Sequence, residues 1–266
     1  MSFDVAAGAC AGMFFFADLL RVKPEKETYW MLAVAVWSIY TFDHLLDAHQ
    51  TSMMAHSKRH RFHQRYFKPL SWGLAIVSIG GLLFAICVFD KLFLFAGLGL
   101  GALIIGSMVL IRYFSKTFAA IKEISIALFY MLGILFAPLW QLDFGFHSNN
   151  WALFAFLYFL LAWYNLIYLS YLDADRDKKD GHRSIITDLG KKGTQTTLWI
   201  LSATGLAYVA FLFLWLPSYY HIYTLILALM FIWHILKFAG QKTGGENVRL
   251  QLEAIFLLPW ILILLP

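Results

Sequence analysis

The chain has 266 residues, of which 61% are hydrophobic and only 14% are charged, with a formal net charge of +5. Soluble domains carry about 25% charged residues, so this composition excludes a globule surrounded by water. The basic residues are spread among apolar segments and form no basic domain of the kind that binds nucleic acid. Basic loops beside anionic lipid explain the charge better, so we expect a protein embedded in membrane lipid that binds no nucleic acid.

Apolar runs long enough to cross a bilayer recur along the whole chain. A span needs about 20 mostly apolar residues in a helix, because the lipid interior leaves no water to satisfy an open backbone. The runs lie at residues 4–20, 28–47, 70–89, 91–112, 121–140, 151–172, 194–216, 221–238 and 250–266. The sequence therefore predicts an all-α polytopic membrane protein. We expect one domain over residues 1–266, with nine transmembrane helices in a single bundle around a central or lateral cavity.

The basic residues also predict an orientation. Most of the 21 lysines and arginines lie in the linkers that follow the even-numbered spans. An excess of positive charge marks the cytoplasmic loops of membrane proteins. We therefore expect these linkers and the N-terminus to face the cytoplasm, as in a multi-pass protein of a bacterial inner membrane.

Two acidic motifs stand at the ends of even-numbered spans. Asp43 and Asp47 end the second span, whereas Asp173 and Asp177 end the sixth, with Asp175 between them. A spacing of four residues places each pair on one helix face. Both motifs emerge on the same predicted side, so we expect their carboxylates to meet around a cation. Oxygen ligands favour Mg²⁺, which keeps some waters and is usually shared with a substrate phosphate.

The second motif carries a resemblance to a known family. The run DADRDKKDGHRSIITDLG resembles an Asp-rich motif of the UbiA superfamily of intramembrane prenyltransferases. Members of that family have nine transmembrane helices, with one such motif after the second helix and another after the sixth. The segment YFSKTFAAIKEISIALFYMLG resembles the family's Lys-bearing entry to the fifth helix, through Lys116 and Lys122. The resemblance implies a Mg²⁺-dependent enzyme that binds an isoprenyl diphosphate.

Site residues follow from the motifs and the resemblance together. The expected metal ligands are Asp43, Asp47, Asp173, Asp175 and Asp177, and the expected catalytic residues are Asp43, Asp47, Asp173, Asp177 and Tyr40. The expected cations around the diphosphate are Lys116, Lys122, Lys179 and Arg183. Asn165 and Tyr168 lead into the second motif and are candidate substrate contacts. For Asn165 the alternative is a hydrogen bond to a neighbouring helix, and for Tyr168 it is ordinary packing.

The first motif differs from the family's usual pattern at one position. That pattern has an Asn where this chain has Ile39, and an Asn there can orient a carboxylate or contact the diphosphate. Tyr40 lies three residues before Asp43 and seven before Asp47, on the same stripe of the helix. We expect its phenol to supply the missing hydrogen bond.

Histidines flank the first motif. His56, His60 and His63 have helical spacing, and we interpret their segment as an interfacial amphipathic helix rather than a metal site. His44 and His49 are candidates for orienting the carboxylates or accepting a proton.

Three functions are compatible with these features. The first is a prenyltransferase that ionises an isoprenyl diphosphate and passes the prenyl group to a lipophilic acceptor. The second is a terpene cyclase of the same superfamily, which quenches the cation internally. The third, from a different class, is a transporter or a non-catalytic membrane subunit.

Overall fold

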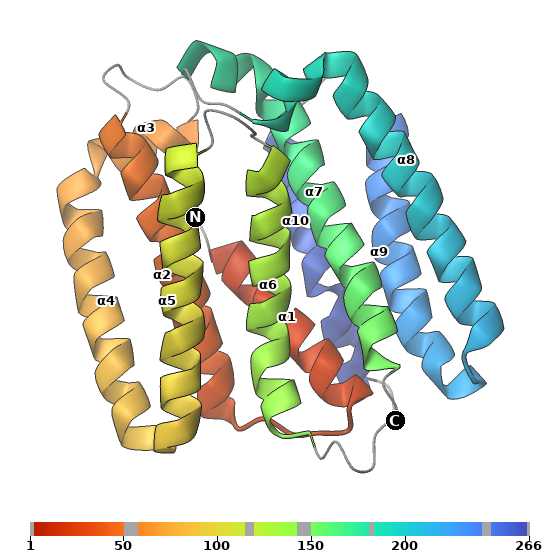
Figure 1. Cartoon of the computed structure of the whole chain (residues 1–266), viewed down its shortest axis with the longest axis horizontal. Coiled ribbons are helices and arrows are strands. Elements are labelled where there is room, and N and C mark those ends of the chain that lie inside the picture. The colour runs from red at the N-terminus through yellow and green to blue at the C-terminus, as the bar shows by residue number, and fades with distance from the viewer. Residues whose placement is uncertain are drawn as a thin grey trace.

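The computed structural model describes residues 3–50, 58–114, 120–142, 150–180, 184–240 and 246–264. These residues form helices and contain no strand, which confirms the predicted all-α class (Figure 1). The helices are α1 (Phe3–Leu19), α2 (Lys26–Gln50), α3 (Lys58–Arg65), α4 (Phe67–Val88), α5 (Lys91–Phe114), α6 (Ala120–Trp140), α7 (Trp151–Asp180), α8 (Ile185–Trp215), η1 (Ser218–Tyr220), α9 (His221–Ala239), α10 (Glu246–Ala254) and η2 (Ile255–Leu264).

Among the described residues, seven helical segments are long and apolar enough to cross a membrane. They correspond to α4, α5, α6, α7, α8, η1 with α9, and α10 with η2. The first two predicted spans are also helical, but α1 has only 17 residues and α2 carries Asp43 and Asp47. A multi-pass membrane protein therefore agrees with the prediction, whereas the total of nine spans stays a prediction.

The helices stand side by side in one bundle, with α4 and α5 at one edge (Figure 1). α1 packs against α2, α6 and η2, and its Phe15 and Phe16 are fully buried. On α4 and α5, by contrast, large apolar side chains such as Trp72, Leu83 and Leu92 are exposed. Lipid is the environment in which such a surface is stable. The burial pattern thus places α1 in the interior of the bundle, whereas α4 and α5 expose apolar side chains on the outside, as contact with a bilayer requires.

Helix α7 and helix α8 extend beyond the predicted spans. α7 continues to Asp180 instead of ending at residue 172, so the second acidic motif lies on the helix and not in a linker. α8 begins at Ile185 instead of residue 194, and Gly190 interrupts it with φ 69° and ψ 171°. A left-handed φ suits glycine because it has no Cβ. Hydropathy missed these turns because their residues are polar, although the backbone hydrogen bonds of the helix continue through them.

The last predicted span, 250–266, also has a different form. It begins earlier, at Glu246, as α10, and then continues as the 3-10 helix η2. Pro259 lies inside η2, and proline has no backbone N–H to donate to an α-helix.

The two motif-bearing helix ends lie at the same end of the bundle, where α3 also lies (Figure 1). α3 forms in the predicted histidine segment and packs between α2 and α4. The side chains of His56 and His60 lie outside the described residues. His63 is buried, and its ring centroid lies 4.9 Å from that of His44 on α2. The topology therefore places the ends of α2 and α7 at the same end of the bundle.

Candidate active site

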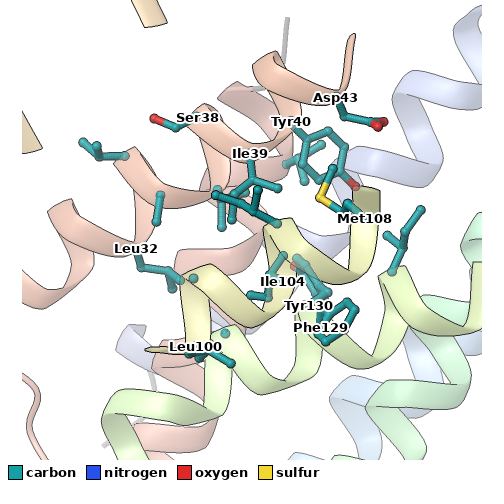
Figure 2. A pocket seen from close by; sticks show the side chains of 18 of the residues that line it. Leu32, Ser38, Ile39, Tyr40, Asp43, Leu100, Ile104, Met108, Phe129 and Tyr130 are labelled. Carbon is teal, nitrogen blue, oxygen red and sulfur yellow. The ribbon is translucent and has the colours of Figure 1, made fainter. Parts of the chain in front are cut away.

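A cavity of about 1270 Å³ runs between the helices. Residues of α1, α2, α4, α5, α6, α7 and α10 line it, and most of them are apolar. Figure 2 shows part of this wall, with Leu32, Ile104, Met108 and Phe129 among the labelled side chains. The acidic side chains of Asp43, Asp47 and Asp173 line the same cavity, close to the ends of α2 and α7. The cavity thus joins a long apolar space to a charged end.

The first acidic motif forms a compact group of donors on α2. Ligand atoms of Asp43, His44 and Asp47 all lie within 4.8 Å of one another. One helical turn separates the two aspartates, as their spacing predicts. Tyr40 lines the cavity beside Asp43 (Figure 2). The centroid of its ring lies 6.2 Å from that of the His44 ring. A hydrated divalent cation fits such a donor set, because the carboxylates supply oxygen ligands and leave room for water.

The second acidic motif is paired with a residue far away in the sequence. Arg249 of α10 donates a hydrogen bond from Nη1 to Oδ2 of Asp173, and from Nε to Oε1 of Glu253 at 3.2 Å. All three side chains line the cavity. Asp175, Asp177 and Lys179 belong to α7, but their side chains lie outside the described part of the chain, as do Lys116 and Arg183. The structure therefore brings Asp43, Asp47 and Asp173 to one cavity.

Glu123, next to the predicted Lys122, links helix α6 to α7 and α8 through hydrogen bonds. Lys122 and Glu123 both line the cavity at the start of α6. Glu123 is only 4% exposed, and its Oε1 accepts hydrogen bonds from the backbone N–H of Ile185 at 3.0 Å and from Ser170 Oγ at 3.2 Å. Ser170 lies on α7 and Ile185 is the first residue of α8. This carboxylate thus caps α8 directly after the second acidic motif.

Asn165 and Tyr168 take different positions. Asn165 lines the cavity, and its Oδ1 also lies 3.3 Å from Nε2 of His234 on α9, so the predicted contact with a neighbouring helix is present, whereas the substrate contact stays a prediction. Asn165, Leu169 and Asp173 all line the cavity, and they follow one another at intervals of four residues, which places them on one face of α7. Tyr168 lies beside this stripe, is fully buried, and packs edge-on against Phe238 of α9. The predicted substrate contact is corrected to a packing contact, because α9 covers that side of α7.

Arg249 and Glu123 belong to neither of the two acidic motifs and are not among the predicted site residues. Arg249 stands four residues before Glu253, and these two are the charged residues of the hydrophobic segment Asn247–Leu264; ionisable pairs in such segments often have a function. Glu123 is an acidic residue inside a predicted span, which is a similar signal. Neither signal identifies the distant partner, because Asp173 lies on α7 and Ile185 lies on α8.

The cavity and its charged end can be compared with known proteins. The model of the UbiA prenyltransferase family matches residues 7–258. No curated protein matches the chain significantly in sequence. Among solved structures, the apo form of a UbiA homolog from Aeropyrum pernix K1 is similar, with a TM-score of 0.62, 18% sequence identity and coverage of 100% of both chains. At 18% identity this structural similarity shows that the two chains share a fold, and it shows nothing about a shared substrate.

Proposed function

The chain belongs to the UbiA prenyltransferase family, and on this premise we propose that it is a Mg²⁺-dependent intramembrane prenyltransferase. It would ionise an isoprenyl diphosphate and transfer the prenyl group to a lipophilic acceptor. The observation that carries this proposal is the shape of the cavity: carboxylates from α2 and α7 line one part, and apolar side chains line most of the rest. A molecule with an anionic head and a long apolar tail has the matching form.

The residues present fit a divalent cation. Asp43 and Asp47, grouped with His44, offer donor atoms close enough to share one ion, and Asp173 of α7 lines the same cavity. When bound, Mg²⁺ neutralises the diphosphate oxygens and makes the diphosphate a better leaving group. Mg²⁺ prefers oxygen ligands, so the aspartates are the residues we expect to hold it.

Other side chains of the cavity would bind and shield the substrate. Lys122 and Arg249 line the cavity and would supply positive charge near the head, where the leaving group develops negative charge. The apolar wall, including Ile39, Leu100 and Ile104, would hold the tail and keep water from the allylic cation. A ring such as that of Tyr40 can stabilise a nearby cation through its π face.

A terpene cyclase is the second candidate function. Tyr40, Phe129 and Tyr130 all line the cavity (Figure 2), and aromatic rings stabilise a carbocation as it migrates along a folded chain. Such an enzyme would use the same ionisation, but the cation would then be quenched by an internal double bond or by loss of a proton. The two functions therefore differ in the product and not in the head-group site.

One experiment tests the proposal and separates the two functions. Purified protein is incubated with radiolabelled geranyl, farnesyl or geranylgeranyl diphosphate and MgCl₂, with and without a membrane lipid extract as the source of acceptor. Prenylated lipid formed only with the extract supports the transferase, and a cyclic hydrocarbon formed without it supports the cyclase. Failure of every diphosphate to be consumed with Mg²⁺, or equal consumption in EDTA, would refute the proposal.

Two variants complete this test. Asp43→Asn removes one carboxylate charge from the first motif and is expected to abolish turnover. Glu25→Gln removes one charge from an exposed side chain between α1 and α2 and serves as the matched control. Equal activity of the two variants would exclude a metal site at the first motif.

A further inference from the structure

Arg249 of α10 has two acidic partners in the cavity, which are Asp173 of α7 and Glu253 of α10 itself. Its Nη1 donates to Asp173 and its Nε donates to Glu253, at 3.2 Å for the latter. The side chains are partly buried, with exposures of 28% for Arg249, 20% for Asp173 and 10% for Glu253. A ligand that enters the cavity can therefore reach this pair, because all three side chains line it.

A divalent ion and the guanidinium of Arg249 compete for the single negative charge of the Asp173 carboxylate. Under the proposed function, Asp173 is a carboxylate expected to hold Mg²⁺, but in the structure a guanidinium already occupies it. A divalent ion that binds Asp173 weakens this pair, and the Nη donors of Arg249 then need another acceptor. Diphosphate oxygens beside the ion are suitable acceptors, since the planar guanidinium fork matches a phosphate group.

Glu253 would hold the guanidinium of Arg249 in the cavity while its Nη atoms exchange Asp173 for the diphosphate. It lies one helical turn after Arg249 on α10 and accepts from Nε, not from the Nη atoms. The Nε contact can therefore persist while Nη1 changes its acceptor. The guanidinium would stay in the cavity and only the direction of its terminal nitrogens would change.

We propose that Arg249 is a diphosphate-binding residue that pairs with Asp173 while the cavity holds no substrate and transfers to the diphosphate when the metal complex binds. This inference rests on the proposed function, because it assumes a diphosphate and a divalent ion at the charged end. Glu253 acts as the positioning residue that keeps the guanidinium beside both acceptors. No bond is made or broken in this step other than hydrogen bonds and ion pairs.

The proposal predicts two effects of opposite sign for Arg249→Gln. Removing the guanidinium frees Asp173 of a competing cation, so a divalent ion alone should bind tighter, by about threefold or more. The diphosphate loses charge-assisted hydrogen bonds, so it should bind about ten- to a hundredfold weaker. A purely structural arginine would weaken both kinds of binding or neither.

Two titrations of the full chain in detergent measure these effects. Mn²⁺ replaces Mg²⁺ in the first, and electron paramagnetic resonance counts the free ion. Inorganic pyrophosphate at saturating Mg²⁺ is the ligand in the second, followed by calorimetry, which makes the result independent of prenyl length. Lys237→Gln is the matched control, because Lys237 lies over the ring of Trp233, 4.5 Å from its centroid, and does not line the cavity.

The outcomes separate this inference from the proposed function. If wild-type protein binds neither Mn²⁺ nor pyrophosphate, the proposed function itself fails. If it binds both, and Arg249→Gln shifts the two affinities in the same direction or matches Lys237→Gln, the exchange is refuted while the proposed function stands. Arg249→Lys keeps the charge but lacks the fork, so it should leave Mn²⁺ binding near the wild-type value and weaken pyrophosphate binding.

A second position keeps the test decisive if Arg249→Gln does not fold. Glu253→Gln removes the charge that holds Nε but leaves Asp173 and Arg249 in place. We expect weaker pyrophosphate binding and no gain in Mn²⁺ affinity, because the guanidinium still competes for Asp173. Unchanged pyrophosphate binding in this variant would overturn the positioning role of Glu253 and, with it, the exchange as described.

Discussion

Replacing Glu123 by alanine is expected to destabilise the junction of α6, α7 and α8 beside the second acidic motif. The backbone N–H of Ile185 donates to Glu123 Oε1 at 3.0 Å, and both residues are buried. Alanine leaves this N–H without its acceptor, and an unsatisfied buried donor costs about 1–3 kcal/mol. The hydroxyl of Ser170 also loses its acceptor, but a serine hydroxyl can turn to a carbonyl of its own helix.

Two further variants show which part of the carboxylate matters. Glu123→Gln keeps an acceptor oxygen for Ile185, so we expect a loss of less than about 1 kcal/mol, from the weaker attraction of a neutral group to the α8 N-terminus. Ser170→Ala removes one hydrogen bond between helices, which in membrane proteins contributes about 0.6 kcal/mol on average. Alanine at 123 should therefore be the most destabilising of the three substitutions.

Thermal unfolding in detergent provides the assay. The chain contains 10 tryptophans, so intrinsic fluorescence reports the transition. For a chain of this size each kcal/mol corresponds to about 2–4 °C in Tm. If Glu123→Gln lowers Tm as much as Glu123→Ala, the charge and not the hydrogen bond stabilises the junction, and the reasoning above is refuted. An unchanged Tm for Glu123→Ala would refute it as well.

The remaining predictions concern the first motif, the packing of α8 and the orientation. Tyr40→Phe should slow turnover about ten- to a hundredfold, because it loses a hydrogen bond to a charged group, whereas Ile39→Ala should retain activity. Full activity of Tyr40→Phe in the diphosphate assay would show that the ring only packs. Gly205→Ala should destabilise by about 1–3 kcal/mol, because a Cβ there would lie 2.4 Å from a buried phenylalanine ring, whereas a Cβ at Gly73 meets nothing within 4 Å. Equal Tm values for the two glycine variants would contradict this packing. A tag in the 48–69 linker should be accessible only from the cytoplasm, and labelling from the opposite side would reverse the predicted orientation.

Much of the helical framework follows from the sequence because its cause is local. A backbone in lipid must satisfy its hydrogen bonds within the segment, so each apolar run becomes a helix whatever surrounds it. The i, i+4 spacing of Asp43 and Asp47 places both on one face for the same local reason. Asp43 and Asp173 line one cavity because the helices that carry them end at the same end of the bundle.

The partners of the charged side chains depend on how the helices pack. Arg249 pairs with Asp173 across 76 positions of sequence, and Glu123 accepts from Ile185 across 62. Hydropathy and spacing describe one segment at a time, so they identify a buried charge but not the helix that supplies its counter-charge. Tyr168 shows the same limit, because its position on α7 allowed either the cavity or a neighbour, and the packing of α9 placed it against Phe238. Contacts between helices arise only when the bundle closes, since the free energy of each contact depends on side chains from segments that no local pattern connects.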